Sequence, residues 1–326
     1  MFISKAPLRL TLAGGGTDLP SYYVNRGARW ISVSINKFCF SQINPSFNNN
    51  FLIKYSEYEN CETVDEIKHP LVREALKFLN IKQPLELTFS ADLPGRTGLG
   101  SSASFLVSFL KALHDFKGEE ITSRNIAEEA TEIEMNILKS PIGLQDQYIS
   151  AVGGLKEFTV DPTGELEWVD LDISEKNIKH IVDNLRLYYT GTVRDSKKLL
   201  TDQVNKTDAK DSSMIRRLDY VTRQVTHVKK CLIQGDELEL GKLFDEHWRM
   251  KRGSSTLMSS NIIDSFYSNA LNSGALGGKV VGAGGGGFIL LVCRDDIKID
   301  NLAEKYGYKK IEFNFEFMGA SRILSK

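Results

Sequence analysis

The residues with the clearest chemical meaning form one glycine-rich stretch, Leu93-Pro94-Gly95-Arg96-Thr97-Gly98-Leu99-Gly100-Ser101-Ser102-Ala103-Ser104. An alternating apolar run at 85–89, typical of a strand, precedes it, and apolar residues at helical spacing follow it. Glycines let a backbone approach a ligand closely, and the first N–H groups of a helix have no intrahelical partner and attract anions. The stretch therefore predicts a phosphate-binding loop that opens a helix.

Two common nucleotide motifs do not fit this loop. A Walker A loop needs a lysine directly after its last glycine, and none follows Gly100. Gly98-x-Gly100-x-x-Ala103 formally matches the dinucleotide fingerprint, but Pro94 separates it from the strand and no second strand ends about 20 residues on. A glycine-rich turn capped by serines is the alternative that the stretch alone leaves open.

A second glycine-rich turn follows the strand expected at 6–12. Apolar and polar residues alternate along this strand, which places Arg9 on the face away from the core. Gly14-Gly15-Gly16-Thr17-Asp18 comes next, where the glycines clear space and the Asp18 carboxylate can accept hydrogen bonds from a polyol. From these residues alone, an ordinary tight turn is an equally good interpretation.

Two further carboxylates have positions that need an explanation. Glu134 borders the apolar stripe of a helix expected between Ser123 and Leu138, so it needs an arginine or a metal as partner unless it is solvated at the edge of the stripe. Asp146 opens the next helix, after the break at 141–143. On spacing alone, Asp146 is a helix cap or a first-turn charge.

Composition excludes several classes of function. The 326 residues carry a net charge of -1, from 41 basic and 42 acidic residues, without a basic stripe interleaved with aromatics, so nucleic acid is not expected as a partner. The four cysteines form no Cys-x-x-Cys pair, and no histidine spacing suggests a zinc site, which favours a reduced, cytoplasmic protein. Neither a membrane-spanning run nor a signal peptide is expected.

The order of the expected elements predicts an α+β protein of two domains. The first domain spans 1–180, and a charged segment at 172–184 marks the boundary. The second domain spans 181–326, with helices near 196–206, 211–234, 236–252 and 261–273. The second domain continues with two strands joined by a polyglycine bend at 279–292, a short helix near 300–306 and a last strand through Phe315, which suggests an open ferredoxin-like sandwich.

Three glycine-bearing motifs in this order resemble the GHMP kinases, the superfamily named for galactokinase, homoserine kinase, mevalonate kinase and phosphomevalonate kinase. The first motif joins Ala6-Pro7-Leu8-Arg9 to 13–18, the second runs from Pro94 to Ala103, and the third from Gly282 to Gly287. The match spans almost the whole chain. The resemblance implies an ATP-dependent kinase with an N-terminal α+β domain, a C-terminal ferredoxin-like domain and an active site between them.

The resemblance also implies roles for residues that match the family. It gives Ser102 and Glu134 as ligands of Mg2+, Asp146 as the catalytic base and Arg9 as the basic partner of Asp146. The third motif packs beside the second and helps to shape the active site, which implicates Gly284 and Gly285 in the sugar site. The second motif wraps the ATP triphosphate, with contacts implied for Pro94, Gly95, Gly98, Leu99, Gly100, Ser101, Ser102 and Ala103.

One departure from the family bears on the substrate. Galactokinases carry Gly-Glu-His-Thr-Asp where this chain has Gly14-Gly15-Gly16-Thr17-Asp18, which disfavours galactose. With Trp248-x-x-Lys251 and Gly274-Ala-Leu-Gly-Gly-Lys279, the chain most resembles bacterial D-glycero-D-manno-heptose 7-phosphate kinases, which phosphorylate the anomeric hydroxyl of a sugar phosphate. The alternatives are a fucokinase-like or galactokinase-like sugar kinase and a non-catalytic sugar sensor on the same scaffold.

A small sugar phosphate is therefore the expected partner, and a homodimer is left open. Gly15, Gly16, Thr17 and Asp18 are expected to face the sugar. A distal phosphate also needs cations on the substrate side. The candidates for that role are Arg29, Arg194, Lys197 and Lys251.

Overall fold

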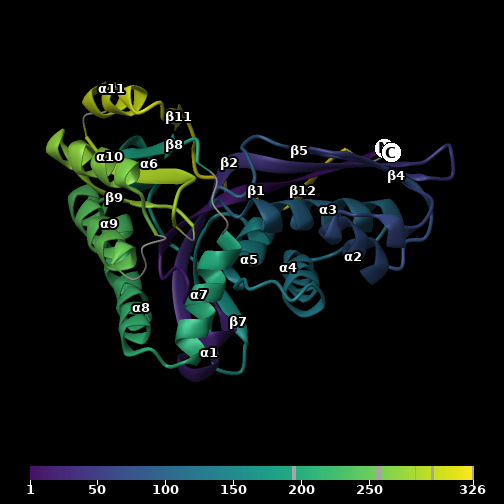
Figure 1. The fold of residues 1–326 in the computed structure, drawn as a ribbon, viewed down its shortest axis with the longest axis horizontal. Helices are drawn as coiled ribbons and strands as arrows, with labels where there is room; N and C mark the ends of the chain where they lie inside the picture. The colour runs from purple at the N-terminus through teal and green to yellow at the C-terminus, as the bar shows by residue number, and fades with distance from the viewer. Residues whose placement is uncertain (193–195, 254–257, 283, 295–296, 325–326) are drawn as a thin grey trace.

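The structure is a computed structural model that describes residues 1–192, 196–253, 258–282, 284–294 and 297–324. It contains two β-sheets, each covered by helices (Figure 1). Two large clusters of buried apolar residues hold the structure together, and one of them joins β1 and β2 of the first sheet to the helices and strands of the second. The two predicted halves therefore share part of their core.

The first sheet has eight strands in the order β12-β1-β2-β5-β3-β4, with β6 paired to β2 and β7 paired to β6. Helices α2, α3, α4 and α5 lie together on one face of this sheet (Figure 1). The elements up to β7 are β1 (Phe2–Ala13), α1 (Pro20–Arg26), β2 (Ala28–Pro45), β3 (Phe51–Lys54), β4 (Tyr58–Cys61), the 3-10 helix η1 (Val64–Glu66), α2 (Pro70–Phe78), β5 (Leu85–Ala91), α3 (Ser101–Lys117), α4 (Ser123–Thr131), the π-helix η2 (Glu132–Ile137), α5 (Gln145–Val152), β6 (Leu155–Val160) and β7 (Leu166–Asp170).

The second sheet has four antiparallel strands in the order β11-β8-β10-β9. A strand, a helical segment, a β9-β10 hairpin, a helix and a last strand follow one another along the chain, which is the expected ferredoxin-like pattern. The predicted fold class is confirmed. The remaining elements are α6 (Glu175–Asp183), β8 (Leu185–Tyr189), α7 (Ser196–Asp208), α8 (Ser212–Gln234), α9 (Glu237–Arg252), α10 (Asn261–Asn272), β9 (Ala275–Val280), β10 (Phe288–Cys293), α11 (Ile297–Lys305), β11 (Lys309–Ile311) and β12 (Ser321–Leu324).

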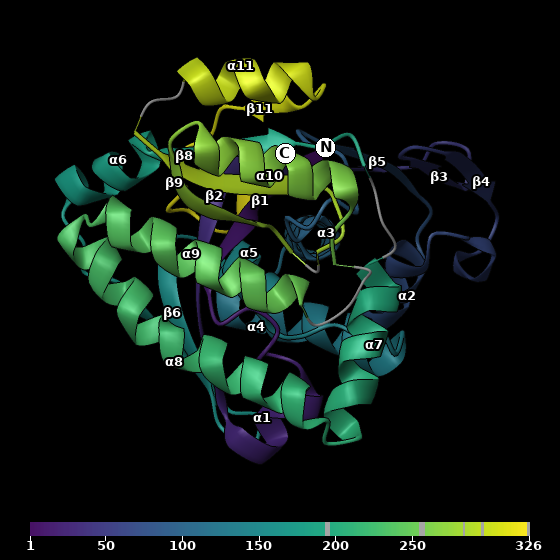
Figure 2. The same cartoon turned by 60° about the vertical axis from the view of Figure 1, so that its left-hand side comes forward.

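The end of the chain differs from the expectation. The expected strand through Phe315 ends at Ile311, and the chain then crosses back so that β12 pairs antiparallel with β1, with Leu324 opposite Ile3. Both ends of the chain consequently lie side by side (Figures 1 and 2). The last strand thus extends the first sheet, whereas the boundary at residue 180 stays a prediction.

Local sequence explains the two elements that carry Arg9 and Glu134. Along β1, Leu8, Leu10 and Leu12 are buried in the core shared with α8 and α9, and Arg9 lies on the opposite face, as its alternation predicted. The single helix expected from Ser123 to Leu138 is instead α4 followed by η2. A π-turn widens the helix locally and is frequent at functional sites, and here it contains Glu134.

Over the described ranges, no helix combines the length and the apolar composition needed to cross a bilayer.

Candidate functional site

The glycine loop and the start of α3 form an anion cradle. Gly98 and Gly100 adopt positive φ angles of 91° and 75°, and Gly100 is the N-cap residue of α3. No side chain caps this N-terminus, and the first turn of α3 contains no acidic residue. The N–H groups of the first turn are therefore available to a phosphate, which the helix dipole also attracts. Ser101 and Ser102 lie in that first turn.

Arg9 and Asp146 form a two-pronged ion pair beside this loop. Arg9 Nε donates to Asp146 Oδ1 at 2.7 Å and Nη2 donates to Oδ2 at 2.8 Å, while Nη1 donates to the Gly98 carbonyl at 2.6 Å. The Arg9 side chain is 5% exposed and the Asp146 side chain 30% exposed. A Cβ at Gly100 would lie 3.1 Å from Arg9 Cγ and 3.3 Å from Asp146 Oδ2. Glycine at this position lets the loop pass directly over the ion pair.

Glu134 is the second carboxylate of the site. It is 3% exposed, and it accepts hydrogen bonds of 2.7 Å from Ser102 Oγ and from Gln147 Nε2. Burial, with a smaller contribution from the charge of Asp146, raises the pKa of Glu134 to about 7 against the effect of the two hydrogen bonds. Oxygen donors of this kind fit a hard cation that keeps water and phosphate ligands. Within the described chain, no cluster of three His, Cys, Asp or Glu residues offers a metal site made by protein alone.

Asp18 anchors the helix that carries Asp146. Its Oδ2 accepts the N–H of Gln145 at 3.1 Å, and its main-chain oxygen accepts the N–H of Leu144 at 3.3 Å. Gly143 lies so close that a Cβ there would be 2.0 Å from Asp18 Oδ2. Burial, with a contribution from the Asp146 charge, raises the pKa of Asp18 to about 6. Asp18 thus couples the first motif to the start of α5.

The third motif packs backbone to backbone against the second. A Cβ at Gly98 would lie 2.6 Å from the Val281 oxygen, and a Cβ at Gly282 would lie 2.4 Å from Gly98 Cα. A Cβ at Gly287 would lie 2.2 Å from the Thr97 oxygen. Each of these residues must therefore be glycine for the two loops to meet. Contacts of this kind agree with a role for the third motif in shaping the site.

The structure brings most of the predicted substrate residues to the same region. Gly15 and Gly16 are partly exposed beside Asp18, whereas Thr17 is fully buried and donates to the Gly14 oxygen at 2.7 Å. On the other side, a Cβ at Gly284 would lie 3.6 Å from Lys251 Cε, and the N–H of Gly285 donates to the Met258 oxygen at 2.7 Å. Lys251 Nζ donates to the Gly282 oxygen. Arg194 and the side chain of Lys197 lie outside the described residues.

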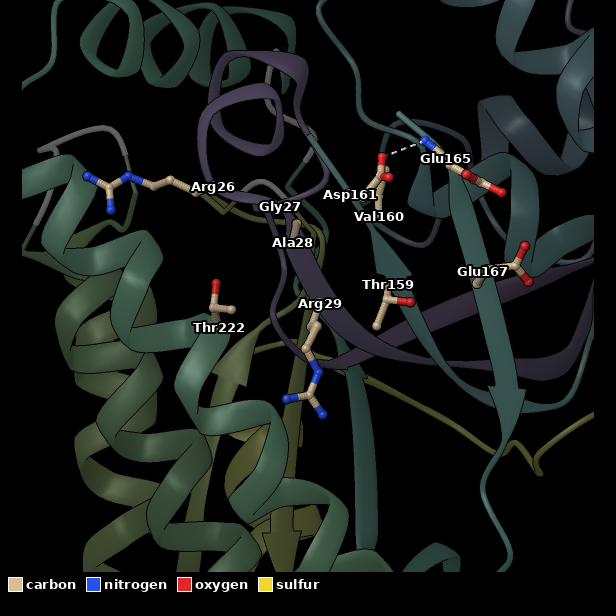
Figure 3. Close-up of a pocket in the computed structure, with 10 residues that line it drawn as sticks. All are labelled: Arg26, Gly27, Ala28, Arg29, Thr159, Val160, Asp161, Glu165, Glu167 and Thr222. Atoms are coloured by element: carbon tan, nitrogen blue, oxygen red, sulfur yellow. Dashed lines mark hydrogen bonds between the residues drawn. The ribbon is translucent and has the colours of Figure 1, made fainter. Parts of the chain in front are cut away.

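Arg29 is not brought to this group. Its Nε donates to Glu157 Oε1 at 2.9 Å, on the face of β2 that packs against α8. Ser32, which lies on the other face of β2, donates to Gln145 next to Asp146. Figure 3 shows Arg29 in a separate pocket, with Thr222 of α8 nearby. The predicted role of Arg29 in substrate binding gains no support from these contacts.

Several polar residues of the region escaped the sequence analysis. Gln145 and Gln147 flank Asp146, and each donates to a carboxylate of the site, so their position beside an acid was an available signal. Arg217 of α8 and His247 of α9 are also buried near the site, together with Lys279 of β9, which the sequence analysis gave only as the end of a motif and without a role. Their positions depend on packing between distant elements, and nothing in the local sequence indicates it.

Two family models match this chain, one in each half. Residues 69–154 match the GHMP kinases N terminal domain, and residues 228–310 match the GHMP kinases C terminal domain. The chain belongs to the GHMP kinases. It is therefore an enzyme, a phosphotransferase that uses an alcohol group as acceptor, and the fold described above is the GHMP kinase fold.

Similar proteins place this GHMP kinase near the sugar kinases. D-glycero-alpha-D-manno-heptose 7-phosphate kinase of Campylobacter jejuni is 25% identical, over 96% of both chains. L-fucokinase/L-fucose-1-P guanylyltransferase of Bacteroides fragilis is 23% identical over 89% of this chain and 34% of its own length. The crystal structure of a D-glycero-D-manno-heptose 1-phosphate kinase from Bacteroides thetaiotaomicron has a TM-score of 0.81 at 21% identity, covering 100% of both chains. That structural likeness supports the fold alone.

Proposed function

We propose that this GHMP kinase transfers the terminal phosphate of ATP to the anomeric hydroxyl of D-glycero-D-manno-heptose 7-phosphate. The product would be the 1,7-bisphosphate, a precursor for nucleotide-activated heptose and surface glycans. The observation that carries the proposal is similarity to a heptose 7-phosphate kinase along 96% of both chains, and the Arg9–Asp146 and Ser102–Glu134 pairs support it. Fucose is the second candidate, because the Bacteroides fragilis relative contains a fucokinase.

Each residue of the site has a task in this proposal. Asp146 orients the acceptor hydroxyl and takes its proton, because its carboxylate is accessible yet fixed by Arg9 at 2.7 and 2.8 Å. Arg9 also offsets the negative charge that builds up beside the phosphates. The N–H groups at the start of α3 hold the triphosphate, and Pro94, Gly95 and Leu99 belong to the same loop.

Ser102 and Glu134 would hold Mg2+, which supplies charge neutralisation for the phosphates of ATP. Their oxygens already lie 2.7 Å apart, because the Ser102 hydroxyl donates to Glu134. A cation would also favour the ionised form of a carboxylate whose pKa is raised by burial to about 7. Gln147 holds the second Glu134 oxygen in place, so the carboxylate needs little rearrangement to accept an ion.

ADP release with ATP and Mg2+ tests the proposal against a panel of heptose 7-phosphate, its unphosphorylated parent, L-fucose and galactose. We expect the highest kcat/KM for heptose 7-phosphate and an anomeric phosphate in the product, identified by phosphorus NMR. Asp146→Asn should fold normally and turn over about 100- to 10,000-fold more slowly. Asp172→Asn, at an exposed position outside the site, is the control for the loss of one charge.

Two results would contradict parts of this proposal. A wild-type preference for fucose or galactose would overturn the heptose assignment and leave the kinase assignment in place. Wild-type turnover by Asp146→Asn would remove Asp146 from the mechanism, whichever sugar is preferred.

A further inference from the structure

A group of basic side chains is buried where α8, α9 and β9 pack together. Arg217 is 7% exposed, His247 9% and Lys279 4%, and Lys251 is partly buried at the end of α9. Burial, together with the charges of Arg217 and Arg9, lowers the pKa of Lys251 to about 7. Burial also lowers the pKa of His247, with contributions from all three neighbouring cations, Lys279, Lys251 and Arg217. These four side chains therefore act on one another electrostatically, and the Asp202 carboxylate offsets part of the effect of burial on the pKa of Arg217.

Arg217 is connected to the sugar side of the site. Its Nη2 donates to Gln203 Oε1 at 3.0 Å, and Gln203 Nε2 donates to the Gly16 oxygen at 2.8 Å. Gly16 has a φ of 88°, which favours glycine, and a Cβ there would lie 3.0 Å from Gln203 Nε2. Helix α8 packs against both α7 and α9. The guanidinium of Arg217 is thus two hydrogen bonds away from the loop that ends in Asp18.

Lys251 reaches the other side of the same region. Its Nζ donates to the oxygen of Gly282, and Gly282 lies against Gly98 of the phosphate loop. Lys279 lies between the first motif and α9, where its Nζ donates to the Leu12 oxygen at 2.6 Å and is 4.0 Å from the centre of the Phe244 ring. The cations therefore extend from the phosphate loop toward the sugar loop.

Placing several cations together in a protein interior is unfavourable, because each lacks part of its hydration and repels the others. An anion bound among them offsets both effects. The phosphates of ATP already have the start of α3 and the proposed metal ligands, so the anion that fits here is one carried by the second substrate. A phosphate at the far end of the sugar has the required charge.

We propose that Arg217 and Lys251, supported by His247 and Lys279, form an anion subsite for a phosphate group that the sugar substrate carries before the reaction. This inference rests on the proposed kinase function and assigns residues to the phosphate that the proposed substrate carries. Arg217 would supply a planar pair of N–H donors and Lys251 a point charge. The sugar ring that carries this phosphate would lie toward Gly16 and Asp18.

Selectivity for the phosphate tests the subsite. The measured quantity is the ratio of kcat/KM for D-glycero-D-manno-heptose 7-phosphate to kcat/KM for the unphosphorylated heptose. We expect Arg217→Gln to lower this ratio about 10- to 150-fold, as the loss of a charged hydrogen bond predicts. Lys251→Met should lower it as well, and Arg217→Lys should lower it less than Arg217→Gln. Arg216→Gln, on the exposed side of the same helix, is the matched control and should leave the ratio unchanged.

A binding experiment without ATP separates this inference from the proposed function. Calorimetric titration with heptose 7-phosphate should show wild-type binding that Arg217→Gln and Lys251→Met weaken, while Arg216→Gln binds like the wild type. Absence of sugar-dependent ATP use by the wild type would refute the proposed function, and the titration would still decide on the subsite. An unchanged ratio and unchanged binding in both Arg217→Gln and Lys251→Met would overturn the subsite. Equal losses on the phosphorylated and unphosphorylated sugars would overturn it too.

Discussion

Asp18→Asn should stabilise the protein at neutral pH while impairing its activity. Asp18 is 6% exposed, and burial and the neighbouring Asp146 raise its pKa from 3.8 to about 6. A pKa that is higher in the folded state than in the unfolded state favours folding at low pH, where the carboxyl is protonated in both states. This contribution is lost as the pH rises from about 4 to above 6. An asparagine does not ionise, so the variant avoids the loss.

The size of the effect follows from the shift. The pKa difference between 3.8 and about 6 corresponds to about 3 kcal/mol in the free energy of unfolding, at about 1.36 kcal/mol per pKa unit. For a chain of 326 residues, that free energy amounts to about 4 °C in melting temperature. The substitution preserves shape, and the asparagine oxygen can still accept the Gln145 N–H that Asp18 accepts at 3.1 Å. The stability gain should therefore not be cancelled by a lost hydrogen bond.

Thermal unfolding of both proteins between pH 4.5 and 8 measures the prediction. The melting temperatures should differ by about 1.5 °C at pH 4.5 and by about 4 °C at pH 8, with the variant higher at both. Asp172→Asn controls for the removal of one acidic charge from an exposed position. A difference that does not change with pH would refute the assignment of the raised pKa to Asp18. In the same preparation, kcat/KM for the sugar should fall, because the sequence predicts that Asp18 faces the sugar and its carboxylate holds the start of the helix that carries Asp146.

Two further predictions concern the metal and the interlocked glycines. Ser102→Ala and Glu134→Gln should each raise the Mg2+ concentration needed for half-maximal ATP use. The double variant should lose less activity than the product of the two single losses, because both residues serve one ion. Fully multiplicative losses of activity with an unchanged Mg2+ titration would contradict a shared ion. Gly282→Ala should lower the melting temperature and the affinity for ATP, because the new Cβ would lie 2.4 Å from Gly98 Cα. The control is Gly307→Ala, which measures the backbone strain alone, because Gly307 has a similar φ of 70° and a Cβ there would meet nothing within 4 Å. Equal effects of the two alanines would show that the contact with Gly98 is unimportant.

The parts of the site that the sequence predicts are those with short-range signals. Glycine spacing before a helical pattern identifies the phosphate loop, and alternation in β1 places Arg9 away from the core. The meeting of Arg9 with Asp146 is different, because 137 residues separate them and only the family resemblance connected them. The β12 strand was missed for a similar reason, since four residues returning to the first sheet carry little periodicity of their own.

Two arginines show the limit of sequence reasoning most clearly. Arg29 lies in β2, which packs against α8, and Arg217 lies in α8 itself. Their sequence neighbourhoods do not reveal which one is connected to the sugar loop. In the structure, Arg29 pairs with Glu157 on the α8 face of β2, and Arg217 joins Gln203, which contacts Gly16. The choice depends on how α7 and α8 pack across the first motif, which is information that no local pattern contains.

Gly98 is the point at which three distant parts of the chain are aligned. Arg9 donates to its oxygen at 2.6 Å, and Gly282 of the third motif presses against its Cα. Arg9 fixes Asp146, and Gly282 accepts a hydrogen bond from Lys251. The proposed base and the proposed anion subsite are thus both fixed relative to one glycine of the phosphate loop. Backbone contacts of this kind leave little freedom between the groups that must align the two substrates, which is what phosphoryl transfer by positioning requires.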